Sequence, residues 1–152
     1  MTVHLTLTEE TDMKRFHVTR HIAAPPERVW SVLTNARALA SGPLGITRID
    51  GDIAPGRSLK LWTAATGTRA FSLAVKTFEQ PRRMTWEGGM PLGLFRGVRT
   101  FTLAPEQDGV RFEMSEEFSG LMAGLIVKSI PDLTPSFEQF ATGLEALAKD
   151  TV

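Results

Sequence analysis

Apolar and polar residues alternate along much of the chain, in short segments separated by turns. Alternation with a period of two is typical of strands that bury one face. Short intervening loops favour an antiparallel sheet over β-α-β units. The expected strands are 14–23, 45–53, 57–66, 69–79, 83–89, 95–104 and 109–118.

The spacing of apolar residues changes at three places, and there it predicts helices. Pro25 and Pro26 suit the first turn of a short helix, because the amide that proline lacks has no partner at that position. A second short helix is expected at about 35–41. From Pro135 onward, one apolar helical face is expected, formed by Phe137, Phe140, Ala141, Leu144 and Leu147.

These elements predict an α+β fold in which a curved, seven-stranded antiparallel sheet holds a long C-terminal helix. The domain is expected to cover residues 14–149, and residues 1–13 to form a tail or arm, with a short extra strand as the alternative. An internal cavity is expected wherever the concave side of the sheet is wider than the helix.

Composition excludes several classes of function. The chain has 17 basic residues (Lys and Arg) and 17 acidic residues (Asp and Glu), so no overall charge favours nucleic acid. There is no cysteine and therefore no thiol nucleophile or thiolate metal site. The longest apolar run, 121–127, is far shorter than the ~20 residues of a membrane span. The start of the chain has no secretory signal pattern, so we expect a cytoplasmic protein. We also expect no cofactor and no metal.

Four passages carry a family resemblance: RHIAAPPERVWSVLTN at 20–35, DGDIAPGRSLKL at 50–61, PRRMTWEG at 81–88 and GVRTFTLAPEQDGVRFEMSEEFSGLM at 97–122. In this order they resemble the SRPBCC superfamily, the START-like and birch-pollen-allergen-like helix-grip proteins, and in particular its polyketide cyclase/dehydrase branch. The resemblance implies a helix-grip fold with a cavity for an apolar or amphipathic small molecule. It does not imply one chemistry, because related cavities serve lipid carriers, cyclases and protein partners.

Glu116 interrupts the apolar face of the last strand, between Met114 and Phe118. If Leu103 faces Val110 across the predicted hairpin, Arg99 lies on the same face and diagonal to Glu116, with Gly97 opposite. We therefore expect an ion pair at the polar end of an apolar pocket, since an unpaired buried charge is costly. Arg20 on the first strand is a second candidate partner. The alternative is that the strand ends or bulges at Met114 and that Glu116 faces water.

The predicted ligand-binding residues are those that share the inner face with this pair or the C-terminal helix. They are Arg99, Glu116, Arg20, Trp86, Phe101, Met114, Phe95, Phe137 and Phe140. The alternative for the aromatic residues is an ordinary core. The loop 88–95 is interpreted as an apolar flap or a plain hairpin loop. The segment 121–127 is a candidate lid, dimer contact or membrane-touching patch.

The sequence supports three hypotheses about function. The first is a carrier or sensor that binds a lipid-like or polyketide-like molecule. The second is a cofactor-free cyclase or dehydratase with Glu116 as its acid/base, a role that pairing with Arg99 would weaken. The third is a protein-interaction or homodimerisation module. His17 and His21 lie about 13 Å apart along a strand, so they do not form a metal site.

Overall fold

The computed structural model describes residues 14–64 and 67–150, and the predicted N-terminal arm therefore lies outside the described residues. Seven strands form one antiparallel sheet in the order β1-β7-β6-β5-β4-β3-β2. Their bounds are β1 Lys14–Ile22, β2 Ile46–Asp50, β3 Ser58–Thr63, β4 Phe71–Glu79, β5 Arg83–Met90, β6 Phe95–Glu106 and β7 Gly109–Ser119. The predicted helix-grip fold is confirmed.

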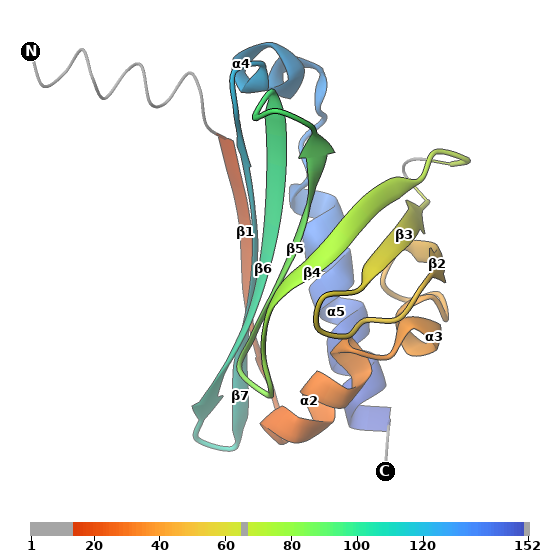
Figure 1. Ribbon diagram of the computed structural model, residues 1–152. Helices are drawn as coiled ribbons and strands as arrows, with labels where there is room; N and C mark the ends of the chain where they lie inside the picture. Colours follow the sequence, from red (N-terminus) through yellow and green to blue (C-terminus); the bar gives the residue numbers. More distant parts are fainter. Residues whose placement is uncertain (1–13, 65–66, 151–152) are drawn as a thin grey trace, which may run out of the picture.

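The helices lie on the concave side and at the two ends of the sheet (Figure 1). Helix α5 runs along the sheet, and α2 and α3 lie at the end of the molecule opposite α4. Their bounds are α2 Pro26–Leu33, α3 Ala36–Leu39, α4 Ala123–Ile126, the 3-10 helix η1 Val127–Ser129 and α5 Thr134–Asp150. None of the helices in the described ranges is long and apolar enough to cross a membrane.

The hairpin of β6 and β7 is tighter than the alternation suggested. Glu106 pairs with Gly109, so the turn contains only Gln107 and Asp108. The predicted register was wrong by two residues, because Pro105 and Glu106 continue the strand instead of forming a longer turn. A shift of two leaves every side chain on its predicted face. Arg99 and Glu116 are therefore directly opposed, not diagonal.

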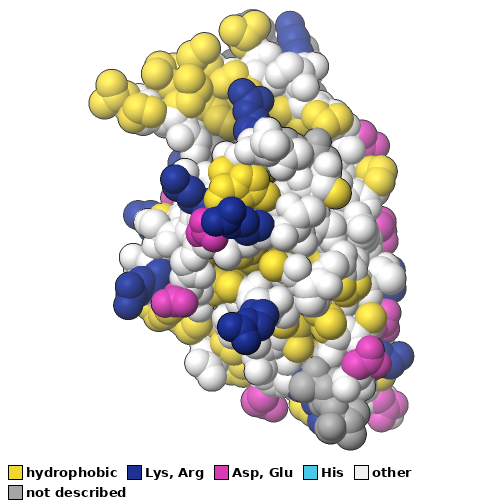
Figure 2. Space-filling view, turned by 90° about the vertical axis from the view of Figure 1, so that its right-hand side faces the viewer, with side chains coloured by type: hydrophobic (Ala, Val, Ile, Leu, Met, Phe, Trp, Pro, Cys, Tyr) yellow, Lys and Arg dark blue, Asp and Glu magenta, His cyan; other side chains and the backbone are white. Residues whose placement is uncertain are grey.

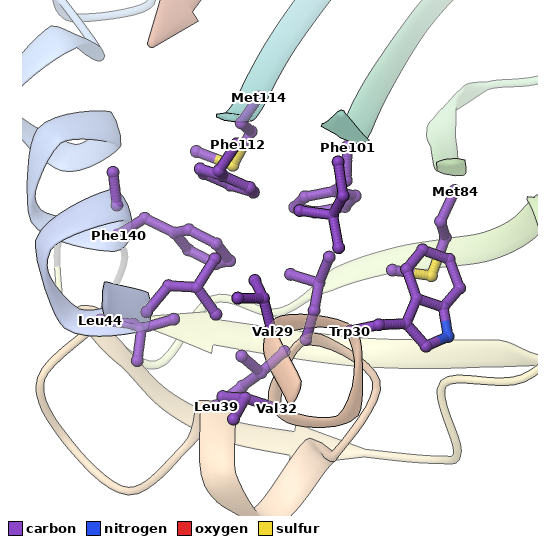
Figure 3. Close-up of a cluster of buried hydrophobic side chains, with 14 of the residues drawn as sticks. Val29, Trp30, Val32, Leu39, Leu44, Met84, Phe101, Phe112, Met114 and Phe140 are labelled. Carbon is purple, nitrogen blue, oxygen red and sulfur yellow. The ribbon is translucent and has the colours of Figure 1, made fainter. Parts of the chain in front are cut away.

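The half of the grip nearest α2 is filled by apolar side chains. Val29 and Leu33 from α2 and Leu39 from α3 are fully buried against the sheet and α5. Figure 3 shows their neighbours Phe101, Phe112, Met114 and Phe140 pointing into the same cluster. This packing closes one end of the space between sheet and helix, which places any polar site toward the end that carries α4.

Candidate functional site

Arg99 and Glu116 lie in one row that crosses the concave face of the sheet. The cross-strand pairs are Trp86 with Arg99, Arg99 with Glu116, and Glu116 with Phe16. Glu116 is 8% exposed and is one of two buried polar residues in the described chain. The row therefore brings a carboxylate, a guanidinium and an indole to neighbouring positions on a face that is otherwise apolar.

The structure contains the ion pair expected from the sequence. Nε of Arg99 donates a hydrogen bond of 2.7 Å to Oε1 of Glu116. Their side chains are 21% and 10% exposed, so solvent reaches both. β7 continues to Ser119, so the alternative in which the strand ends at Met114 is wrong. The ion pair on the inner face of the sheet is therefore present in the structure.

Aromatic rings surround the pair. The guanidinium of Arg99 lies 5.0 Å from the ring centroid of Phe137, at cation-π distance. Phe16 contacts both Phe137, at 6.2 Å between ring centroids, and Phe118, at 6.3 Å. The pair is thus held between rings supplied by β1, β7 and α5.

Gly97 lets the carboxylate of Glu116 and the ring of Phe118 pack closely against β6. A Cβ atom at this position would lie 3.2 Å from Oε2 of Glu116 and 3.2 Å from the ring of Phe118. Among the described residues, the Arg99–Glu116 bond is the only hydrogen bond that either side chain makes. Because a guanidinium has five N–H donors and a carboxylate has two acceptor oxygens, most of the hydrogen-bonding capacity of the pair is not used by the described residues.

Arg20 is not a partner of Glu116, which corrects the second pairing expected from the sequence. Its Nη1 lies 3.0 Å from Oε1 of Glu145 and its Nη2 lies 3.6 Å from Oε2 of Glu138, both on α5. In the register of β1 and β7, Arg20 opposes Phe112. That position is four residues, about 13 Å, from Glu116 along β7. Arg20 therefore ties α5 to the sheet.

The other predicted ligand-binding residues lie deeper in the fold. Trp86 and Phe101 are fully buried and pack at 4.7 Å between ring centroids, and Phe101 lies 5.9 Å from Phe140. Met114 belongs to the same buried cluster. Nε1 of Trp86 has no hydrogen-bond partner within the described residues, which is unusual for a buried indole N–H.

Two of the hollows on the described surface stand out, and neither is the internal cavity expected from the sequence. One, of about 790 Å³, lies between the α2–α3 connection and β2 and includes Arg37, Arg48 and Asp52. The other, of about 420 Å³, lies at the β5–β6 hairpin and includes Phe95 and Met90. Neither is lined by Arg99 or Glu116. The first hollow was not predicted, because none of its lining residues interrupts an apolar strand face as Glu116 does.

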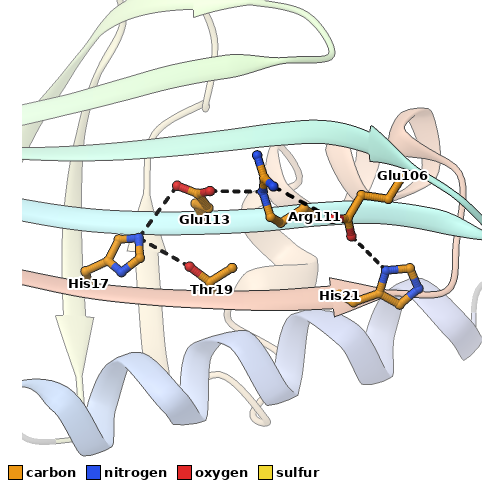
Figure 4. Close-up of polar contacts among 6 residues, drawn as sticks. All are labelled: His17, Thr19, His21, Glu106, Arg111 and Glu113. Carbon is orange, nitrogen blue, oxygen red and sulfur yellow. Dashed lines mark hydrogen bonds and ion pairs between the residues drawn. The ribbon is translucent and has the colours of Figure 1, made fainter.

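His17 and His21 lie on the outer face of the sheet (Figure 4). Nε2 of His17 is 3.6 Å from Oε2 of Glu113, and Nδ1 of His21 is 2.9 Å from Oε1 of Glu106. Arg111 lies between the two carboxylates. Within residues 14–64 and 67–150, no three side chains of metal-binding type come together.

Comparisons with known proteins place this geometry in a family. The sequence pattern of the family described as polyketide cyclase/dehydrase and lipid transport matches residues 13–150. None of the curated proteins matches the chain significantly.

Solved structures share the fold. A crystal structure of a protein from Mesorhizobium loti is 23% identical, with a TM-score of 0.72 over 91% of this chain and 99% of the other. Truncated norcoclaurine synthase from Thalictrum flavum is 16% identical, with a TM-score of 0.70 over 92% of this chain and 96% of the other. At these identities the likeness shows the fold alone. The match over residues 13–150 shows that the chain belongs to the polyketide cyclase/dehydrase and lipid transport family of the SRPBCC superfamily.

Proposed function

We propose that the protein binds an amphipathic small molecule, as a carrier or sensor, with the polar group of the ligand at Arg99 and Glu116. The observation that carries this proposal is the solvent-reached ion pair on an apolar sheet face. Its unused donors and acceptor can hydrogen-bond a ligand oxygen, while the rings of Phe16, Phe118 and Phe137 can contact an apolar portion. Membership of a family that includes lipid transport supports this class of ligand.

The ion pair favours binding over acid/base catalysis. Oε1 of Glu116 is already occupied by the guanidinium, whereas the remaining N–H donors of Arg99 can bind a ligand oxygen without breaking the pair. The fold is shared with norcoclaurine synthase. We therefore keep a second candidate function, a cofactor-free cyclase in which Glu116 is the acid/base.

The ligand must enter from the end that carries α4. The opposite half of the grip is occupied by the buried cluster around Phe101, Phe112 and Phe140. A ligand that reached this half would have to displace aromatic side chains that are already in contact. We therefore place the polar group of the ligand at Arg99 and Glu116 and its apolar part among the rings around them.

Native mass spectrometry of the purified protein tests the proposal, followed by uptake from a panel of fatty acids, sterols and polyketide-like aromatics. A discrete added mass that is reduced in Arg99→Leu and Glu116→Gln would support it. Arg111→Leu and Glu113→Gln are matched controls, because they change the same residue types on the exposed face of β7. A bare chain with no uptake, or equal uptake by all four variants, would overturn the proposal. Turnover of a panel compound that Glu116→Gln abolishes would favour the cyclase.

A further inference from the structure

Four apolar side chains project at the end of the molecule that carries α4, and we call them the apolar tip. They are Met90, Leu92, Leu121 and Leu125, and their exposed fractions are 44%, 92%, 85% and 68%. Figure 2 shows hydrophobic side chains gathered at this end, the end at which Figure 1 places α4 and the β5–β6 loop. An exposed cluster of large apolar residues is more often a contact surface than an accident of the fold.

The two segments that form the apolar tip are joined to each other. The backbone N–H of Leu121 donates to the carbonyl of Gly93 at 3.2 Å, and that of Met122 donates to the carbonyl of Leu94 at 2.7 Å. Leu92 has a φ of +62°, a left-handed conformation that is unfavourable for a bulky residue. Glycine would suit this position better, so the fold itself gives no reason for an exposed leucine there.

The two sequence segments that form the apolar tip carry basic but no acidic residues, and Glu87 lies just before the first of them. Residues 88–105 and 118–131 contain no Asp or Glu, whereas they contain Arg96, Arg99 and Lys128. Arg96 and Arg99 are paired with Glu87 and Glu116, and Lys128 forms no ion pair with the described residues. Projecting leucines beside an unpaired lysine suit an interface that is apolar inside and anionic outside.

We propose that the apolar tip docks on an anionic lipid surface, with Leu92, Leu121 and Leu125 inserted among the lipids. A second copy of the chain fits this region less well. A stable protein interface buries about 800 Å² on each partner and needs a matching surface. Here the hydrophobic side chains stand out from the end of the molecule instead of forming a flat face (Figure 2).

Docking at this end would place the membrane beside the candidate ligand site. Phe95, which follows the β5–β6 loop, stacks on Phe118 at 5.6 Å between ring centroids. Phe118 in turn contacts Phe16 next to the Arg99–Glu116 pair. The docking proposal does not depend on that pair, because it concerns only the exposed side chains of the apolar tip.

Co-sedimentation with vesicles tests the proposal. We expect the protein to bind vesicles of phosphatidylcholine and phosphatidylglycerol more tightly than vesicles of phosphatidylcholine alone, and added salt to reduce the difference. Changing Leu92 and Leu121 together to Ser should weaken binding by about tenfold for each side chain removed from the lipid. The same two positions changed to Met should retain binding, because methionine is also apolar.

The contribution of charge has a matched pair of variants. Lys128→Glu should weaken binding to the anionic vesicles by about fivefold or more. Lys149→Glu should bind like the wild type, because Lys149 lies near the C-terminal end of α5, far from the apolar tip (Figure 1). Absence of vesicle binding, or equal binding by the Ser and Met variants, would overturn the proposal. A dimer in solution that dissociates in the Ser variant, without any vesicle binding, would also overturn the proposal. The apolar tip would then be a protein interface.

Discussion

Arg99 and Glu116 face each other directly across β6 and β7, and the hydrogen bond between them measures 2.7 Å. Replacing Arg99 alone by Leu leaves a mostly buried carboxylate without its cation. We expect Arg99→Leu to lower the free energy of unfolding by about 1–3 kcal/mol. Changing both residues to Leu should recover most of that loss, because an apolar pair can replace a buried ion pair at little cost.

Urea unfolding of the two single variants and the double variant measures this coupling. Arg111→Leu and Glu113→Leu provide the control cycle on the exposed face, where a pair contributes about 0–1 kcal/mol. Losses that simply add in the Arg99–Glu116 cycle would show that the two side chains do not interact.

Parts of the site could be predicted from sequence because an error of two residues in register keeps every side chain on its predicted face. Arg99 and Glu116 remain on the same face after a shift of two residues, so the ion pair was expected even though the hairpin turn was misjudged. The pairing of Arg20 with α5 could not be predicted, because it depends on how the helix lies across the sheet. The packing around Phe101 and Phe140 likewise depends on rotamers that no sequence pattern specifies.

Gly143 lies where α5 passes the segment before β2. A Cβ atom there would come within 2.6 Å of the backbone carbon and oxygen of Pro43. Alanine favours a helix by about 1 kcal/mol over glycine. We nevertheless expect Gly143→Ala to destabilise the fold, by about 1–3 kcal/mol, because backbone atoms must move to admit the methyl group.

Thermal or urea unfolding of Gly143→Ala and of Thr142→Ala makes the comparison. Thr142 is exposed on the same helix, so its replacement should have a small effect or stabilise slightly. A stabilised Gly143→Ala variant would mean that the segment at Pro43 yields easily.

Asp132 precedes α5, and its carboxylate accepts a hydrogen bond of 3.0 Å from the backbone N–H of Thr134. This hydrogen bond holds the pKa of Asp132 below its ordinary value. A lowered pKa in the folded state adds stability above the ordinary pKa of about 3.9. That contribution is lost as the pH falls through the lower, folded value.

The pH dependence of unfolding for the wild type and for Asp132→Ala tests this assignment. The wild type should be the more stable at neutral pH, and the difference should shrink as the solution becomes acidic. Asp132→Asn keeps an acceptor oxygen without titrating, so its stability relative to Asp132→Ala should change little with pH. A difference between wild type and Asp132→Ala that stays constant down to about pH 2 would contradict the role of the charge.

The buried N–H of Trp86 suggests a feature of the ligand, provided that the proposed binding function holds. A fully buried donor without a protein acceptor can bond to an oxygen on a bound molecule. Trp86 is the cross-strand neighbour of Arg99, so such an oxygen would lie near the polar end of the site. We therefore expect the wild type to bind 2-acetylnaphthalene about tenfold more tightly than 2-ethylnaphthalene, which has a similar shape but no acceptor.

Isothermal titration with the two naphthalenes, on the wild type and on Trp86→Phe, measures this preference. The phenylalanine variant keeps an aromatic ring but lacks the N–H, so its affinities for the two compounds should become equal. Phe101→Leu is the control, because it alters the packing around the indole without removing the donor. Equal binding of both compounds by the wild type would show that the N–H of Trp86 does not contact the ligand. A preference that persists in Trp86→Phe would assign the contact to another donor, such as Arg99.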